Sequence, residues 1–149
     1  MGSYKIILAE DHPRFRQVTK KFIEENDELT VVGEAADGLE LLELLGQLLP
    51  DMVITDISMP RLRGLDAAKK IKELYPQLKV LILTIHNEKD FLDRAMSTGV
   101  DGYVLKQEMD EELYSAIRSI RSGKFYISPC LKPIHEKLIL ELRLNPSIF

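Results

Sequence analysis

Residues 51–56 read Asp-Met-Val-Ile-Thr-Asp, and residues 57–64 continue as Ile-Ser-Met-Pro-Arg-Leu-Arg-Gly. The first stretch is a short apolar run, and the second is rich in residues that favour turns. A short apolar run bounded by turn residues is typical of a strand that is buried on both faces. The run stops at Asp56, so the predicted strand places a carboxylate at the rim of a sheet. Asp56 is therefore the first candidate functional residue.

Similar apolar runs recur on either side of this strand and alternate with helical periodicity. The other predicted strands cover residues 4–9, 29–35, 79–84 and 102–105. The predicted helices cover residues 13–25, 37–48, 64–75, 87–98 and 110–123. Solid apolar strands are buried on both faces, which indicates a parallel sheet with helices on both sides. We therefore expect a doubly wound α/β fold built from five strand–helix units.

Single residues refine the predicted helices. Asp37 and Asp110 each precede a helical pattern, and aspartate is a favoured N-cap residue. The leucines of residues 41–49 are expected in the core. Arg118 and Arg121 fall near the end of the last predicted helix, where cations are favoured. We expect a solvated face there rather than a patch that binds nucleic acid.

Two more carboxylates follow the first predicted strand. Glu10 and Asp11 come directly after the run of residues 4–9. The carboxyl ends of parallel strands meet at one edge of a sheet, so both acids are expected near Asp56. Neighbouring carboxylates repel one another unless a cation intervenes, and an oxygen-only cluster favours Mg²⁺ or Mn²⁺. Two alternatives stay open: Glu10 and Asp11 cap the helix that begins at Pro13, or Asp56 has a cap or turn role.

Thr84 and Lys106 end the fourth and fifth predicted strands, at the same edge as the acids. The Lys106 ammonium could simply neutralise the carboxylates. A hydroxyl and an ammonium beside a metal-bound carboxylate could equally hold the oxygens of a transferred phosphoryl group. A carboxylate can itself accept that group covalently. The whole set is harder to explain by chance than any member of it.

The sequence closely resembles the receiver domain of two-component response regulators over residues 4–123. The motifs that carry this resemblance are Glu10-Asp11, Asp56-Ile57-Ser58-Met59-Pro60 with Gly64, Thr84, and Tyr103-Val104-Leu105-Lys106. Further stretches resemble the LuxR-type (NarL/FixJ-like) branch, namely residues 10–13, 83–86, 99–103 and 123–129. The resemblance implies a flavodoxin-like sheet of five parallel strands in the order 2-1-3-4-5.

The resemblance also implies a phosphorylation site. Asp56 would accept a phosphoryl group from the phosphohistidine of a sensor histidine kinase. Glu10, Asp11 and Asp56 would hold Mg²⁺ together with the backbone carbonyl of Ser58. The chain would then be a regulatory domain that catalyses only its own phosphorylation and slow dephosphorylation, not a dedicated enzyme.

Other roles that the resemblance implies concern switching and hydrolysis. Lys106 and the Thr84 hydroxyl would bind the phosphoryl oxygens, and Tyr103 would swing inward when Thr84 moves. Ser58 and His86 would point toward the attacking water and set the rate of dephosphorylation. The alternatives are a half-buried Tyr103 with no switching role and a His86 that is only a surface histidine.

Composition limits the partners. The net charge of −4 and the pI of about 5.4 argue against direct binding to nucleic acid. The single cysteine, Cys130, suits a reducing cytoplasm, and no apolar run approaches the roughly 20 residues of a membrane span. We expect a cytoplasmic protein that forms a homodimer on phosphorylation. In the LuxR-type branch, DNA is bound by a C-terminal helix-turn-helix domain, for which 149 residues leave no space.

The final residues, 124–149, are expected to be a linker or tail with a short amphipathic helix within residues 134–143. The chain is then either a truncated regulator or a stand-alone one.

Three rival functions remain. A flavodoxin-like FMN protein is disfavoured because Glu10 and Asp11 would repel phosphate. A hydrolase of small phosphoesters is disfavoured because Ser58 is a poor general acid. A receiver that acts without phosphate is disfavoured by the complete set of site residues.

Overall fold

The computed structural model describes residues 3–144, which form one parallel six-stranded sheet in the order β2-β1-β3-β4-β5-β6. The strands are β1 (Tyr4–Ala9), β2 (Leu29–Ala35), β3 (Met52–Thr55), β4 (Lys79–Thr84), β5 (Gly102–Leu105) and β6 (Tyr126–Ile127). The helices are α1 (Pro13–Glu24), α2 (Gly38–Leu45), α3 (Gly64–Leu74), α4 (Lys89–Thr98), α5 (Met109–Arg121) and α6 (Lys132–Leu144). Two 3₁₀ turns, η1 (Lys106–Glu108) and η2 (Pro129–Leu131), precede α5 and α6.

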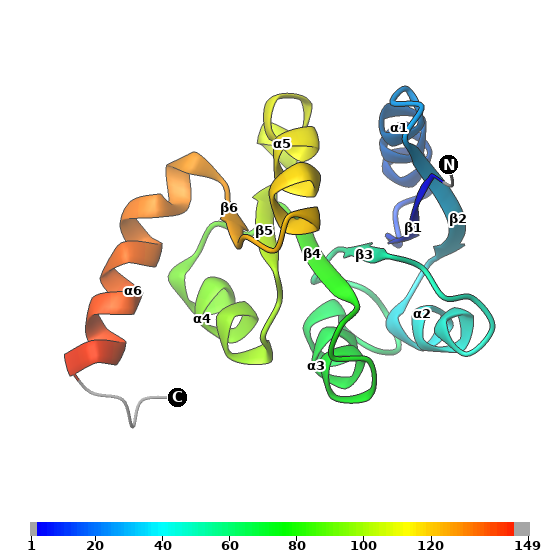
Figure 1. The fold of residues 1–149 in the computed structure, drawn as a ribbon. Helices are drawn as coiled ribbons and strands as arrows, with labels where there is room; N and C mark the ends of the chain where they lie inside the picture. The colour runs from blue at the N-terminus through cyan, green and yellow to red at the C-terminus, as the bar shows by residue number, and fades with distance from the viewer. Residues whose placement is uncertain (1–2, 145–149) are drawn as a thin grey trace.

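Helices cover both faces of the sheet. Figure 1 shows α1 and α5 on one face and α2, α3 and α4 on the other. Successive residues of a strand point to opposite faces, so Ile6 and Ile54 join the core under α1 and α5, whereas Ile7 and Val53 join the core under the other helices. All four are fully buried. This arrangement confirms the doubly wound parallel fold.

The sequence predicts five strands, whereas the sheet has six. The order 2-1-3-4-5 is present, but β6 adds a sixth strand in parallel beside β5. Ser128 continues this pairing, because its amide donates to the Tyr103 carbonyl at 2.9 Å and its hydroxyl accepts from the Leu105 amide at 2.9 Å. A strand of two residues has no periodicity that the sequence could reveal.

The C-terminal segment forms a helix, α6, which packs beside α4. Leu138 is buried in the core on the α4 side, and Glu141 lies 3.6 Å from Lys89 at the start of α4. The expectation of a helix within residues 134–143 is confirmed, with one or two further residues at each end. Residues 145–149 of the expected tail lie outside the described residues.

One of the two expected helix caps is present. The Asp37 carboxylate accepts a hydrogen bond from the Glu40 amide at 2.8 Å, so Asp37 caps α2. The cap expected at Asp110 is wrong, because α5 already begins at Met109 and is preceded by Glu108 without a side-chain cap. The 3₁₀ turn η1 leads directly into α5.

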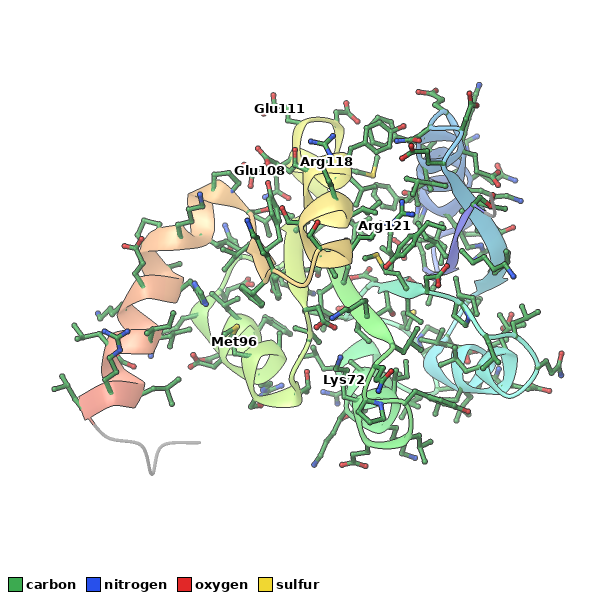
Figure 2. All side chains as sticks on the ribbon, in the orientation of Figure 1. Lys72, Met96, Glu108, Glu111, Arg118 and Arg121 are labelled. Atoms are coloured by element: carbon green, nitrogen blue, oxygen red, sulfur yellow. The ribbon has the colours of Figure 1, made fainter. Side chains whose placement is uncertain are left out.

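Two expectations about exposure have different outcomes. Leu41 and Leu45 are buried as expected, but Leu49 is 82% exposed because α2 ends at Leu45. Arg118 and Arg121 are exposed on α5, as the sequence predicts, and Figure 2 shows them on that helix. Within residues 3–144, no helix is both long and apolar enough to cross a membrane.

Candidate functional site

The three acids converge because their strands are neighbours in register. Ala9 at the end of β1 pairs with Thr55 at the end of β3, so the residues that follow both strands emerge at the same level. Glu10, Asp11 and Asp56 each place a carboxylate oxygen within 4.8 Å of the other two. Three carboxylate donors at this spacing can hold a hard divalent cation.

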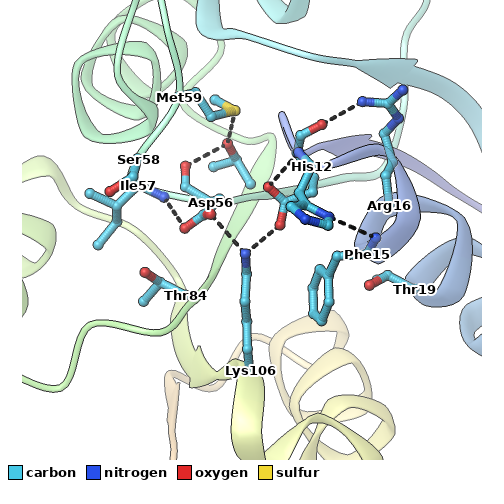
Figure 3. Close-up of polar contacts among 12 residues, drawn as sticks. His12, Phe15, Arg16, Thr19, Asp56, Ile57, Ser58, Met59, Thr84 and Lys106 are labelled. Carbon is cyan, nitrogen blue, oxygen red and sulfur yellow. Dashed lines mark hydrogen bonds and ion pairs between the residues drawn. The ribbon is translucent and has the colours of Figure 1, made fainter.

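Asp56 is almost fully buried, at 6% exposure. Its Oδ1 accepts a hydrogen bond from the Ile57 amide at 2.7 Å, and its Oδ2 accepts from Lys106 Nζ at 2.8 Å (Figure 3). The Thr55 hydroxyl donates to the Asp56 carbonyl at 3.0 Å. These contacts fix the position of the carboxylate at the sheet edge, and a carboxylate can act as a nucleophile.

Lys106 links the acids across the sheet edge. Its ammonium donates to Glu10 as well as Asp56, and Nζ lies 4.4 Å from the centre of the Phe15 ring. Burial lowers the pKa of Lys106, but the hydrogen bonds to Asp56 and Glu10 outweigh that effect and raise the pKa. The lysine therefore stays charged at a position that excludes most water.

Glu10 shows that one ammonium does not balance three carboxylates. Burial raises the pKa of Glu10, and the hydrogen bond from Lys106 offsets only part of this effect, while the nearby Asp56 charge raises the pKa further. Asp11 is exposed beside this pair. An additional cation would relieve the repulsion, so the donor set fits a divalent metal.

Neither Glu10 nor Asp11 caps α1. The N-cap is His12, whose Nδ1 accepts from the Phe15 amide at 3.4 Å. The alternative in which the two acids serve as helix caps is therefore wrong. Glu10 instead accepts at its carboxylate from the His12 amide at 3.3 Å.

Thr84 and Tyr103 meet at the backbone of His86. Thr84 is fully buried at the end of β4, and its hydroxyl accepts from the His86 amide at 3.3 Å. Tyr103 is fully buried in β5, and its hydroxyl donates to the His86 carbonyl at 2.7 Å. Burial raises the pKa of Tyr103, with the charges of Glu88 and Asp56 adding to the effect, so the phenol stays a donor.

The side chains of Ser58 and His86 bind one another. The Ser58 hydroxyl oxygen lies 2.8 Å from His86 Nε2, and the imidazole stacks on Phe91 at 4.1 Å between ring centres. Glu88 Oε2 lies 3.7 Å from His86 Nδ1. His86 is thus more than a free surface histidine, since it joins the loop after β3 to the first turn of α4.

Sequence reasoning missed several neighbours of the site. No sequence signal places the ring of Phe15 against Lys106 or that of Phe91 against His86. Arg61 was missed altogether. Arg61 has a φ of 63°, and its Nε lies 2.7 Å from Oδ2 of Asp37, a residue that is distant in the sequence.

Residues 6–118 match the model of the response regulator receiver domain. The chain belongs to this family. The oxygen regulatory protein NreC of Staphylococcus carnosus is 40% identical to this receiver over 126 residues, which are 84% of this chain and 58% of that protein. The nitrate/nitrite response regulator NarL of Escherichia coli K12 is 33% identical over 140 residues, which are 94% of this chain and 63% of that protein. The chain thus spans less than two thirds of either relative.

Solved structures agree with this assignment. A LuxR-family response regulator from Aurantimonas superposes on the receiver with a TM-score of 0.87 at 32% identity, covering 93% of this chain and 99% of that one. RcsB, solved as two dimers bound to two parallel DNAs, has a TM-score of 0.84 at 30% identity, covering 91% of this chain and 69% of that one. The receiver therefore belongs to the LuxR-type branch.

Proposed function

We propose that this receiver is a phosphorylation switch in which Asp56 accepts a phosphoryl group from the phosphohistidine of a sensor histidine kinase. One observation carries the proposal. The Asp56 carboxylate lies among two further carboxylates, within 4.8 Å, and a lysine ammonium at 2.8 Å. The same small space thus holds a nucleophile, ligands for a divalent cation and a fixed positive charge, which are the parts that phosphoryl transfer needs.

In the transfer, a carboxylate oxygen of Asp56 attacks the phosphorus and forms an O–P bond. The P–N bond of the phosphohistidine breaks, and its electron pair stays on the imidazole nitrogen. Glu10, Asp11, Asp56 and the Ser58 carbonyl would hold Mg²⁺, which neutralises charge on the phosphoryl oxygens when it is bound. Mn²⁺ could take the same place, because it prefers the same oxygen donors.

Lys106 and Thr84 would bind the oxygens of the phosphoryl group after transfer. The Lys106 ammonium is already at the acceptor, so it needs little movement. The Thr84 hydroxyl would have to turn toward the phosphoryl group and give up its contact with the His86 amide. Because the His86 carbonyl is held by Tyr103, this turn would also shift the contacts of the tyrosine. The switch is then a population shift between two arrangements of residues 84–91 and β5.

The output of this switch would be dimerisation and control of transcription. Phosphorylation would favour a homodimer, and DNA would be bound through a helix-turn-helix domain that is not among these 149 residues. The relatives support this step, because three of them, DegU, YhcZ and YxjL, are named transcriptional regulatory proteins and are longer than this chain. Residues 4–123 would be the receiver, to whose sheet β6 adds an edge strand, and residues 124–149 would form the connecting segment. The only catalysis would be the domain's own phosphorylation and slow dephosphorylation in the cytoplasm.

Intact mass spectrometry after incubation with a small-molecule phosphodonor and Mg²⁺ tests the acceptor. We expect one phosphoryl group on the wild-type chain, and none on Asp56→Asn or after chelation of Mg²⁺. Asp51→Asn is the matched control, because Asp51 lies at the opposite end of β3 and is exposed. Addition to Asp56→Asn at the wild-type level would disprove the acceptor assignment. No addition under any condition would favour a receiver that acts without phosphate.

A further inference from the structure

The loop between β3 and α3, residues 56–63, contains one strained backbone position. Among residues 3–144, Arg61 is the only non-glycine residue with a positive φ, at 63°. This left-handed conformation is unfavourable for a residue that carries a Cβ, unless surrounding contacts impose it. Arg61 is neither glycine nor asparagine, so its own backbone preference does not explain the conformation.

Asp37 supplies the contact that holds Arg61. Arg61 Nε donates to Asp37 Oδ2 at 2.7 Å, while Asp37 Oδ1 accepts from the Glu40 amide at 2.8 Å. The Asp37 side chain is only 7% exposed, although that of Arg61 is 58% exposed. The Arg61 guanidinium is the main reason that the pKa of Asp37 lies below its usual value. One carboxylate thus ties the start of α2 to the strained residue of the loop.

The backbone around this ion pair is also closely packed. The Gly38 amide donates to the Leu62 carbonyl at 3.0 Å, and a Cβ on Gly38 would lie 2.3 Å from that oxygen. At the far end of the loop, the Gly64 amide donates to the Ile57 carbonyl at 2.9 Å. A Cβ on Gly64 would lie 1.7 Å from the Asp56 carbonyl oxygen. The loop is therefore anchored beside Asp56 at one point and on α2 at the other.

We infer that the Asp37–Arg61 ion pair is a positioning element for the metal site. It holds Arg61 in the left-handed conformation and so fixes the path of residues 58–60, which include the backbone carbonyl of Ser58. The inference rests on the proposed function, in which that carbonyl is a metal ligand. Mg²⁺ tolerates little deviation from octahedral geometry, so a loosened carbonyl would weaken its binding.

The direction in which the affinity for Mg²⁺ changes distinguishes this positioning role from a purely electrostatic one. Removal of a nearby positive charge should strengthen the binding of a divalent cation, because the charge repels it. Loss of a positioning contact should weaken binding. Arg63→Ala is a matched control for Arg61→Ala, because Arg63 belongs to the same loop, is exposed, and makes no ion pair within residues 3–144.

The test is a titration of each variant with MgCl₂ at constant ionic strength, followed by the amide NMR shifts of residues 56–64. We expect Arg61→Ala to bind Mg²⁺ roughly tenfold more weakly than wild type, and Arg63→Ala to bind as tightly as wild type or more tightly. Thermal unfolding without metal verifies that both variants are folded. If Arg61→Ala binds as tightly as Arg63→Ala, the inference is overturned. If the wild-type chain binds no Mg²⁺, the proposed function fails and the inference falls with it.

Two more variants separate the backbone from the ion pair. Arg61→Gly removes the guanidinium but adopts a positive φ freely, so it should recover part of the affinity that Arg61→Ala loses. Asp37→Ser keeps a capping oxygen for α2 but does not reach Arg61, so it should weaken Mg²⁺ binding as Arg61→Ala does. The double variant Asp37→Ser/Arg61→Ala should bind no more weakly than either single variant. Additive losses in the double variant would contradict a joint role of the two residues.

Discussion

His86 Nε2 lies 2.8 Å from the Ser58 hydroxyl oxygen, and this contact joins the loop after β3 to the loop after β4. Asp56 lies two residues before Ser58, and Thr84 lies two residues before His86. The contact therefore links the segments that follow the acceptor and Thr84. The stacking of His86 on Phe91 extends it to α4. The same imidazole thus contacts both the loop after β3 and the first turn of α4.

Replacement of His86 should shorten the life of the phosphorylated protein. In His86→Ala, the Ser58 hydroxyl loses its partner and the stacked ring disappears, so water reaches the acyl phosphate more easily. We expect dephosphorylation to become several-fold faster, with a smaller increase for Ser58→Ala. Intact mass measured over time after removal of the phosphodonor gives the rate. His135→Ala, which removes a histidine on α6, should leave it unchanged. A half-life equal to wild type from mildly acidic to mildly basic pH would disprove the role of His86.

The Asp37–Arg61 ion pair should make stability depend on pH in acid. The pKa of Asp37 is lower in the folded chain than its ordinary value of 3.8, because Arg61 and the Glu40 amide favour the carboxylate. Such a group stabilises the fold above the unfolded pKa and loses this effect as pH falls from 3.8 toward the folded value. Asp37→Asn keeps the cap but lacks the charge. Urea unfolding at a series of pH values should show the two proteins differing at neutral pH and converging in acid. A difference independent of pH would refute this assignment.

Gly64 should tolerate no side chain. A Cβ there would lie 1.7 Å from the Asp56 carbonyl oxygen, which is a backbone atom and cannot move aside as a flexible side chain could. We expect Gly64→Ala to lower the free energy of unfolding by at least about 3 kcal/mol or to prevent folding. Gly46→Ala is the control, because that glycine has a φ of −72° and its Cβ would lie 3.3 Å from the Glu43 carbonyl. Its effect should stay under about 1 kcal/mol. Equal melting temperatures for the two variants would contradict the close approach.

The other end of the sheet should affect stability without affecting phosphorylation. Lys72 on α3 (Figure 2) donates to Asp101 at 2.9 Å and to the Leu78 carbonyl at 3.1 Å. Asp101 immediately precedes β5, whereas Lys106 follows that strand. Lys72→Met leaves Asp101 without its nearest cation. We expect it to lower the free energy of unfolding by about 2 kcal/mol, which is less than the loss of a fully buried pair would cause. Lys70→Met, on the same helix but exposed, should be nearly neutral. Chemical denaturation measures both, and a loss of Asp56 phosphorylation in folded Lys72→Met would argue against this separation.

The sequence predicts the candidate site well because the site depends on a simple rule of parallel sheets. Each buried strand is a solid apolar run, and the residue after it must emerge at the same edge. This rule is sufficient to bring Glu10, Asp11, Asp56 and Lys106 together without any knowledge of side-chain packing. The identity of the cap on α1 does not follow from it. Two acids and His12 all precede Pro13, and only the path of the chain decides that the imidazole takes that place.

Contacts between distant segments explain the remaining misses. Arg61 is held in a left-handed conformation by a carboxylate from another loop, so its own propensity gives no signal. Leu49 continues a leucine pattern, but the helix ends before it and leaves it exposed. The Ser58–His86 contact depends on how two loops meet. For Arg61 and for the Ser58–His86 contact, packing between distant segments decides a geometry that no local preference signals.

Strand β6 has a practical consequence for fragments of this protein. Strands at a sheet edge carry unpaired backbone groups that can pair with another chain. Here β6 and Ser128 cover the outer side of β5. A chain cut after residue 123 would keep the three carboxylates of the site, Thr84 and Lys106. It would leave the backbone groups on the outer edge of β5 unpaired. Such a fragment would be prone to self-association by strand addition, and this aggregation would imitate the dimerisation expected from phosphorylation.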